Sequence, residues 1–253
     1  MSVDHKKNII EVNDVSFSYG DVEVLKNISL AIHQGDYISL IGPNGGGKTT
    51  LLKIMLGLIK PQSGEIKLFG EKIENFKHWS KLGYVPQKAI NFDPLFPVTV
   101  REVVSMGRFG KKGLLNWLGK TDEKIIDRAL QQVQMSQYAD RLIGNLSSGQ
   151  QQRVFIARAL AGEPEIIFLD EPTVGVDTKN QEEFYSILTD LNKNLNITLI
   201  LVSHDVDVVS QQVTELACLN QTLIYHGEPN KFMKGHYLEN IYGKNSRLVD
   251  HKH

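Results

Sequence analysis

Three features that would assign the chain to a common structural class are scarce: cysteine, long hydrophobic runs and an excess of charge of one sign. The 253 residues include a single cysteine, Cys218, so an internal disulfide or a CxxC metal site is excluded. Cys218 lies in the apolar run 216–219, which predicts a small buried residue rather than a reactive thiol. The longest apolar stretches, such as residues 197–202, are far shorter than the roughly 20 residues that a membrane span needs.

Charge is balanced along the chain. Lys and Arg number 28 against 29 Asp and Glu, a net charge of -1, whereas nucleic-acid-binding proteins usually carry a basic excess. We therefore expect no nucleic-acid partner. The opening residues carry charges without a long apolar segment, so we expect no secretory signal peptide. These observations predict a soluble, cytoplasmic protein that acts at a membrane only through a partner.

The order of the apolar segments predicts an α/β fold in a single domain, residues 1–253. Short strands separated by Gly and Asp predict an N-terminal antiparallel β subdomain, at residues 9–12, 15–19, 24–32 and 65–69. Continuously apolar runs predict the buried strands of a mostly parallel sheet, at residues 37–41, 165–170 and 198–203. Between about residues 88 and 162 the pattern becomes helical, with Thr121 as a plausible helix N-cap, which predicts an inserted helical subdomain.

A glycine-rich segment fits the phosphate-loop pattern G-x-x-x-x-G-K-[ST], with a strand before it and a helix at about 50–58 after it. Glycines let backbone N–H groups approach phosphates, and the following helix adds its N-terminal dipole. Lys48 is expected to reach the β- and γ-phosphates and the Thr49 hydroxyl to hold Mg²⁺. The pattern predicts the core of a P-loop NTPase; a glycine-rich turn with a surface lysine is the alternative. The predicted nucleotide-binding residues are Gly42, Pro43, Asn44, Gly45, Gly46, Gly47, Lys48, Thr49 and Thr50.

Two carboxylates follow the apolar strand 166–169, at the strand end where open α/β sheets bind ligands. Asp170 is expected to hold Mg²⁺. Glu171 is expected to act as the general base that polarises the attacking water. Because Pro172 follows directly, a solvated turn is the alternative.

A third motif, residues 146–153 with the sequence LSSGQQQR, precedes a helical run at 154–161. Small residues at a helix start can bind an anion, although Ser-Ser-Gly is also typical of an ordinary N-cap. The motif lies between the phosphate loop and the carboxylate pair. In this order the sequence resembles the ATPase subunits of ABC transporters, whose signature is usually LSGGQ.

The resemblance implies functional roles for residues that have an ordinary structural interpretation. Without it, Tyr19 would be a strand aromatic, Gln87 a turn residue and His204 a core histidine. Tyr19 would stack on adenine, Gln87 would sense Mg²⁺ and the membrane partner, and His204 would lie near the γ-phosphate. Asp177 matches the D-loop aspartate. The sequence departs from the family pattern at two positions. Ser148 replaces the usual signature glycine, and Gly46 stands where Ser or Ala is common. Because both residues are small, we expect the backbone still to approach phosphate closely. The signature residues that would complete the ATP site of a second copy are Ser147, Ser148, Gly149 and Gln150.

In this family two cassettes close head to tail over ATP and Mg²⁺, and hydrolysis reopens them. The resemblance implies a peripheral subunit on the cytoplasmic face of the cell membrane. It would drive a separate integral membrane permease through residues of roughly 88–99, with an extracytoplasmic solute-binding protein in the same system. A soluble ABC ATPase, a non-catalytic regulator, a P-loop kinase and an exporter remain alternatives.

The subfamily likeness points to import of a divalent metal, zinc ahead of manganese. Residues 96–100, 104–108, 171–177 and 225–227 are similar to those of zinc and manganese importers. The terminal Asp250, His251 and His253 could add a partial zinc site, although a disordered polar tail is the ordinary interpretation. Import of another solute, such as an iron chelate, is the alternative within the family.

Overall fold

The structure is a computed structural model that describes residues 4–87, 97–113, 116–173 and 178–235. It divides into two compact units, one comprising Lys77–Leu199 and the other Ser2–Phe76 together with Ile200–His253. Strand β8 (Thr198–Val202) begins in the first unit and ends in the second. The predicted α/β class, with an antiparallel N-terminal sheet and mostly parallel buried strands, is confirmed.

The N-terminal sheet has the strand order β2-β1-β4-β5, and all its pairings are antiparallel. The sequence predicts two strands at 9–12 and 15–19, but the structure has one long strand with a bulge between Val12 and Val15. Asp14 adopts a positive φ of 50° there, and its N–H donates to the Ser29 hydroxyl oxygen at 2.9 Å. The bulge interrupts the alternation of apolar residues, so one strand has the pattern of two. The strands are β1 (Asp4–Tyr19), β2 (Val22–Gln34), β4 (Ser63–Leu68) and β5 (Glu71–Lys72).

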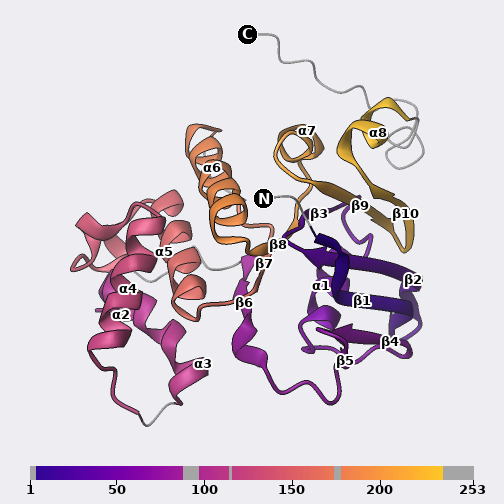
Figure 1. The fold of residues 1–253 in the computed structure, drawn as a ribbon. Helices are drawn as coiled ribbons and strands as arrows, with labels where there is room; N and C mark the ends of the chain where they lie inside the picture. The colour runs from indigo at the N-terminus through magenta and orange to yellow at the C-terminus, as the bar shows by residue number, and fades with distance from the viewer. Residues whose placement is uncertain (1–3, 88–96, 114–115, 174–177, 236–253) are drawn as a thin grey trace. The chain divides into compact units, whose positions relative to one another are not determined.

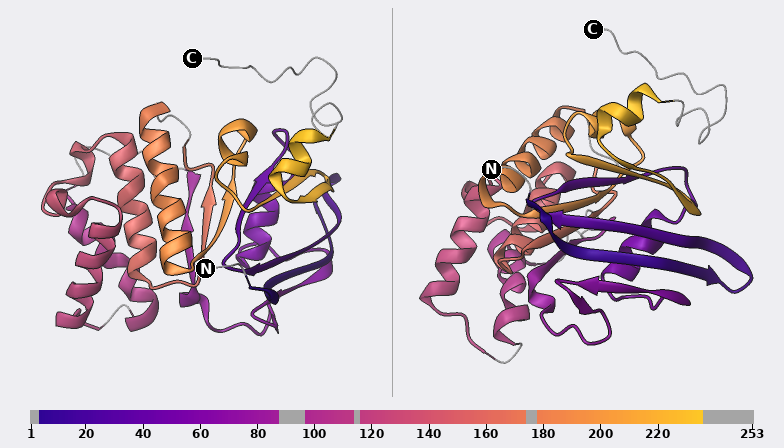
Figure 2. Two further views of the ribbon diagram at one scale, coloured as in Figure 1. Left: turned by 45° about the horizontal axis from the view of Figure 1, so that its top comes forward. Right: turned by 45° about the vertical axis from the view of Figure 1, so that its right-hand side comes forward.

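In the same unit, three strands of the second sheet lie in the order β10-β9-β3, next to α1 (Figure 2). Strands β3 and β9 are parallel, in register from Ile38↔Glu215 to Ile41↔Cys218. Cys218 is fully buried, as predicted, and burial raises the pKa of its thiol to about 12, so it stays protonated at neutral pH. The elements are β3 (Tyr37–Ile41), β9 (Glu215–Asn220), β10 (Thr222–Gly227), α1 (Lys48–Met55), α7 (Val206–Ser210) and α8 (Pro229–Lys234).

The other unit pairs two parallel strands, from Leu82↔Ile166 to Val85↔Leu169, and carries a helical layer. In this layer α2 and α4 pack on α5, which is buried along most of its length (Figure 1). The strands are β6 (Leu82–Val85) and β7 (Ile166–Asp170). The α-helices are α2 (Val100–Ser105), α3 (Phe109–Lys112), α4 (Lys120–Gln132), α5 (Ser148–Ala161) and α6 (Thr178–Leu195). The 3₁₀ turns are η1 (Trp79–Lys81), η3 (Met106–Arg108), η4 (Ser136–Tyr138) and η5 (Ile143–Asn145).

The start of α4 corrects one expectation from the sequence. Helix α4 begins at Lys120 with Gly119 as its N-cap, so the prediction of Thr121 is wrong. The reason is Asp122, whose Oδ2 accepts a hydrogen bond from the Gly119 N–H at 3.0 Å. Its Oδ1 accepts from the Arg108 Nε at 3.0 Å, so a single buried carboxylate fixes both the helix start and the neighbouring turn η3.

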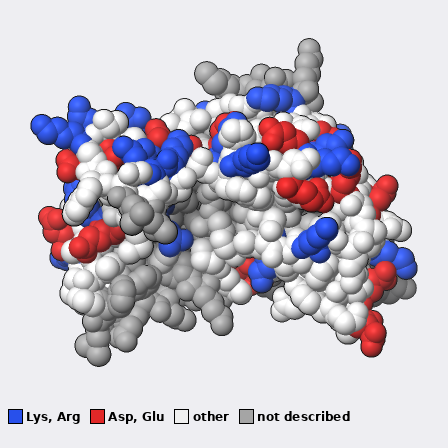
Figure 3. Space-filling model, turned by 90° about the horizontal axis from the view of Figure 1, so that it is seen from below, with Lys and Arg blue, Asp and Glu red and all other residues white. Residues whose placement is uncertain are grey.

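Charged side chains at the surface carry both signs. On the face drawn in Figure 3, Lys and Arg are interspersed with Asp and Glu and do not gather into one large basic patch. Among the residues that the structure describes, no helix combines the length and the hydrophobicity needed to cross a bilayer.

The Arg108–Asp122 pair should stabilise its unit in a pH-dependent way. The Gly119 hydrogen bond, followed by those of Lys112 and Arg108, holds the pKa of Asp122 at about 2, below its ordinary value of 3.8. Asp122→Asn should therefore lower the melting temperature by several degrees at pH 7, because the buried Arg108 cation loses one of its two carboxylate partners and keeps only Glu163. The stabilisation is fully present above pH about 4, and it should diminish as the pH falls towards 2, which thermal melts at several pH values would measure.

Asp127→Asn is the matched control on the same helix. Asp127 pairs with Arg101 at 2.8 Å, but its side chain is 59% exposed, so the melting temperature should hardly change. An equal fall in melting temperature for the two variants would contradict a special role for the buried Arg108–Asp122 pair.

Candidate functional site

The glycine-rich loop joins the fully buried strand β3 to helix α1. Gly47 caps α1 in the left-handed conformation, with φ 94°, and Gly42 and Gly45 also have positive φ. Asn44 and Gly45 are exposed, whereas Lys48 and Thr50 are buried. The loop thus places exposed backbone groups at the N-terminus of a helix, where an anion is favoured.

Lys48 is the charged group of this loop. Its ammonium group donates to the carbonyl oxygens of Gly42 and Pro43, both at 2.9 Å, and only 5% of the residue is exposed. The loop therefore holds its own cation in place before any phosphate arrives. A phosphate at the helix N-terminus would meet this cation together with the backbone N–H groups.

Strand β9 packs its backbone directly against the loop. A Cβ at Gly42 would lie 1.9 Å from the Leu219 carbonyl oxygen, and one at Gly46 would lie 2.8 Å from it. The Gln221 N–H donates to the Gly46 carbonyl at 3.1 Å. In this chain a larger residue at position 46 would be crowded, because even one methyl group there meets backbone atoms. Sequence analysis missed Leu219 and Gln221, since nothing local marks a strand that buttresses a loop about 175 residues earlier.

Two further predicted residues lie in the same unit. Tyr19 ends β1, is 52% exposed, and contacts Phe17 edge to face with 4.9 Å between ring centroids. Its ring can therefore accept a flat partner. His204 is exposed just after β8, and the preceding residue Ser203 donates its N–H to the Leu40 carbonyl of β3 at 3.1 Å. The alternative of a buried core histidine is excluded by this exposure.

The other unit brings two predicted residues together. Gln87, two residues after β6, donates its Nε2 hydrogen to the Glu171 Oε2 at 2.6 Å. Glu171 follows β7 and adopts a positive φ of 43°, a conformation that non-glycine residues seldom take. Such backbone strain clusters at functional positions, because the surrounding structure must maintain it. The strand end thus aims a carboxylate whose position is fixed by an amide.

Asp170 lies at the buried end of β7, with 3% of the residue exposed. Burial raises the pKa of the nearby Tyr84 phenol, and the negative charge of Asp170 adds to the rise. Asp170 thus places carboxyl oxygens in a poorly hydrated position, and such oxygens are suitable ligands for a hard cation.

The signature segment begins α5 with a capping box. The Gln150 N–H donates to Ser147 Oγ at 3.3 Å, and the Ser147 N–H donates to Gln150 Oε1 at 3.1 Å. Gly149 faces Asn180 of α6, where a Cβ would lie 3.2 Å from the asparagine Cβ. Ser147 is therefore the N-cap of α5, and the role of the motif in the ATP site of a second copy stays a prediction. Asp177 lies outside the described residues, so its position is not described.

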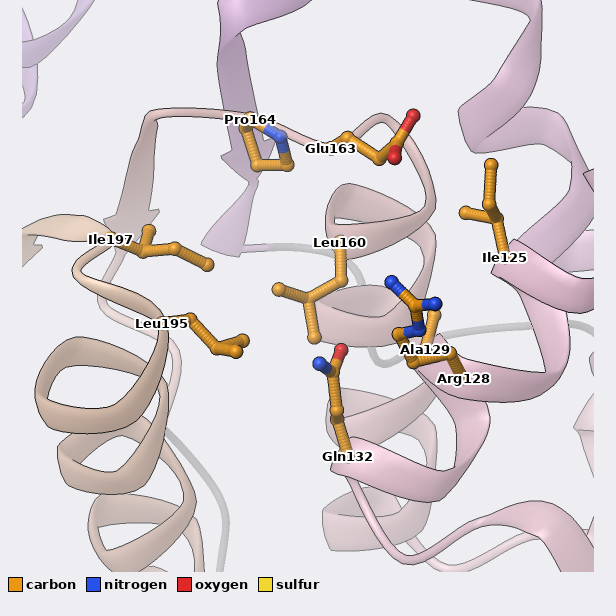
Figure 4. A pocket seen from close by; sticks show the side chains of 9 residues that line it. All are labelled: Ile125, Arg128, Ala129, Gln132, Leu160, Glu163, Pro164, Leu195 and Ile197. Atoms are coloured by element: carbon orange, nitrogen blue, oxygen red, sulfur yellow. The ribbon is translucent and has the colours of Figure 1, made fainter.

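The unit Lys77–Leu199 also has two surface hollows away from the predicted residues. One, between α4, α5 and the turn from α6 to β8, has an apolar floor made by Leu160 and Ile197 (Figure 4). Arg128 and Glu163 approach it from its sides. The other is a groove beside β6 with two large side chains at its rim, Trp79 and Met106, each 43% exposed. The groove is also lined by Tyr84, Lys111 and Arg158.

Gly46→Ala should disturb the phosphate loop, because the new methyl group would push the Leu219 carbonyl or the loop itself aside. Overpacking of this kind costs about 1–3 kcal/mol, so ATP affinity should fall about tenfold or more. Binding of a fluorescent ATP analogue to the purified variant measures this. Gly110→Ala is the control, since a Cβ there meets nothing within 4 Å. If Gly46→Ala binds ATP as tightly as the parent, the backbone of β9 can move aside at little energetic cost.

Comparison with known proteins agrees with this geometry. A family model for ABC transporters matches residues 25–174. The chain is 49% identical over 232 residues to the zinc uptake system ATP-binding protein ZurA of Listeria monocytogenes, covering 92% of this chain and 90% of that protein. It is 40% identical over 220 residues to the manganese transport system ATP-binding protein MntB of Halalkalibacterium halodurans, covering 87% of this chain and 86% of that protein.

Solved structures give the same result for the fold. The dimeric, post-hydrolysis structure of the ATP-binding cassette MJ0796 bound to ADP and Pi superposes with a TM-score of 0.73 at 30% identity. The match covers 87% of this chain and 98% of that chain. The chain therefore belongs to the ABC transporter family and is the ATP-hydrolysing cassette of such a transporter.

Proposed function

We propose that the chain powers import of a divalent metal ion, zinc ahead of manganese, through a separate membrane permease. The observation that carries the substrate is the 49% identity, over 92% of the chain, to a zinc uptake ATP-binding protein. Manganese is the second candidate because a manganese transport protein is 40% identical. An extracytoplasmic solute-binding protein would deliver the ion, and the cassette would work as a peripheral subunit on the cytoplasmic face of the membrane.

Nucleotide binding is assigned to the loop 42–50 and Tyr19. The Lys48 ammonium would neutralise the β- and γ-phosphates, and the exposed ring of Tyr19 would stack on adenine. Thr49, Gln87 and Asp170 offer hydroxyl, amide and carboxylate oxygens, the donor types that Mg²⁺ prefers. Mg²⁺ bound by such residues neutralises charge on the phosphates.

Hydrolysis is assigned to Glu171, with His204 and Gln87 as assisting residues. A carboxylate can accept a proton from an attacking water, and the 2.6 Å hydrogen bond from Gln87 orients the Glu171 side chain for this task. His204 would place its imidazole near the γ-phosphate. The strained backbone at Glu171 supports a catalytic rather than a structural role.

We further propose that two copies pair head to tail. Ser147, Ser148, Gly149, Gln150 and Asp177 of one copy would complete the ATP site of the other. The support is the dimeric cassette structure at 30% identity and the Ser147 hydroxyl at the start of α5. Closure would be favoured because ATP binds the closed pair better than the open one.

The permease is assigned to the groove beside β6. An exposed Trp and Met at its rim, with Lys111 and Arg158 in its lining, suit an amphipathic helix from a partner. Strand β6 lines this groove and leads directly to Gln87, so the partner would act on the catalytic carboxylate through one short segment. The expected contact at 88–99 lies mostly outside the described residues.

Glu171→Gln should bind ATP but lose hydrolysis by about 100-fold or more, because the amide cannot accept a proton. ATP should hold its dimer closed, which size-exclusion chromatography with ATP would detect. Glu165→Gln, at the opposite end of β7 and paired with Lys81 at 2.9 Å, is the matched control and should hydrolyse normally. Near-normal ATPase activity of Glu171→Gln in the assembled transporter would refute the assignment of the base.

Deleting the gene should impair growth in a chelator, with rescue by zinc at a lower concentration than by manganese or iron. A gene copy encoding Glu171→Gln should not restore growth, which links uptake to hydrolysis. Equal growth of mutant and parent under limitation of all three metals, in a strain without a redundant importer, would contradict metal import but leave the ATPase assignment intact.

A further inference from the structure

A cluster of histidine and carboxylate side chains lies at the start of β3 and β9, in the unit that carries the phosphate loop. One ligand atom from each of His33, Asp36 and Glu215 lies within 4.8 Å of the other two. The His33 Nδ1 is 3.2 Å from the Asp36 Oδ2. A fourth residue, His226 of β10, places its Nε2 3.0 Å from the Glu215 Oε2.

The backbone holds these residues in place. His33 and Asp36 flank a tight turn between β2 and β3, in which Gly35 has φ 87° and the Asp36 N–H donates to the His33 carbonyl at 3.2 Å. The His33 N–H donates to the Asp36 Oδ2 at 2.6 Å. Thr214 and Tyr37 are joined by three hydrogen bonds, of 2.7, 2.9 and 3.1 Å, so Glu215 is fixed beside Asp36. Because ordered elements hold all three potential ligands, their positions are set before any metal ion binds.

The cluster is also poor in water. The Asp36 side chain is fully buried, and those of Glu215, His33 and His226 are 15%, 19% and 25% exposed. Two carboxylates side by side in poorly hydrated surroundings favour a bound cation, because a cation offsets the repulsion between them.

We propose that His33, Asp36 and Glu215 form a binding site for a divalent transition-metal ion, and that zinc is its best occupant. His226 would not be a ligand but would orient Glu215 through their hydrogen bond, as outer residues do at zinc sites. Three protein ligands leave a position for water or for a small anion.

The donor set decides the choice of metal. Imidazole nitrogen with two carboxylates suits zinc, whereas Ca²⁺ and Mg²⁺ take oxygen ligands and larger coordination numbers. Bond lengths of 2.0–2.2 Å to tetrahedral zinc put ligand atoms roughly 3.4 Å apart. The separation of 3.2 Å between the His33 and Asp36 atoms is close to this value, and the Glu215 oxygen, within 4.8 Å of both, would move closer to complete the site.

The site would fasten together the two strands that support the phosphate loop. Asp36 precedes β3, which ends at Gly42, and Glu215 begins β9, whose Leu219 packs against that loop. The metal would thus sit roughly 15 Å from the loop, at the opposite ends of both strands. Binding at this site does not depend on the proposed function; if zinc import is correct, the ion is the one that the transporter delivers.

The test uses the full-length, nucleotide-free chain with excess Mg²⁺, and with His251 and His253 replaced by Ala in every protein so that the tail cannot compete. Calorimetry with Zn²⁺ and absorption spectra with Co²⁺ should show one site per chain with tetrahedral cobalt bands. His33→Ala and Glu215→Gln should each weaken binding by about 100-fold, and His226→Ala by about 10-fold. Zn²⁺ should raise the melting temperature of the parent more than that of the His33 and Glu215 variants.

His78→Ala, at an exposed histidine of the other unit, is the matched control and should bind as the parent does. Melting curves without metal establish that each variant is folded, and the Co²⁺ spectrum of the parent is informative even if a variant fails to fold. An octahedral cobalt spectrum, or equal Zn²⁺ affinity in parent, His33→Ala and Glu215→Gln, would overturn the proposal. Neither result depends on transport, so failure here is separate from failure of metal import.

Discussion

The contact between the Leu219 carbonyl and the glycines of the phosphate loop is the constraint on which the nucleotide site depends. Parallel pairing of β3 with β9 carries the Leu219 backbone to the point where β3 ends. No side chain fits between the two segments at Gly42. Because backbone atoms of β9 pack against the buried side of the loop, its exposed side keeps a fixed shape. Anion binding by a short loop requires such rigidity, since its N–H groups have to point the same way.

In the unit Lys77–Leu199, side chains rather than backbone atoms fix the candidate catalytic group. A parallel pair, β6 and β7, ends in Gln87 on one side and Asp170 with Glu171 on the other. The amide and the carboxylate meet because their strands are neighbours in register, from Leu82↔Ile166 to Val85↔Leu169. The groove beside β6 is lined by residues 82–84 of that strand, which ends two residues before Gln87.

Local patterns predicted most of the fold, and the roles that they assign to the site residues stay predictions. The phosphate loop, the buried strands at 37–41 and 198–203, and the capping serine at 147 are each specified by adjacent residues. Sequence analysis failed at positions whose structure depends on residues that lie far away in the sequence. Asp122, rather than Thr121, sets the start of α4, because Arg108 and Gly119 both bind its carboxylate. The restriction at Gly46 and the His33 cluster depend on β9, which no motif links to them.

The hydrogen bonds that fix Lys48 in the loop affect which anions can compete for this site in the cell. Its ammonium group is bound by the carbonyls of Gly42 and Pro43 at 2.9 Å each, so an incoming anion has to compete with two dipoles already in place. A single sulfate or orthophosphate offers fewer contacts than a polyphosphate to offset the loss of these two hydrogen bonds. A polyphosphate chain can engage several loop N–H groups before it takes the cation, so the loop favours long phosphate chains over abundant small ones.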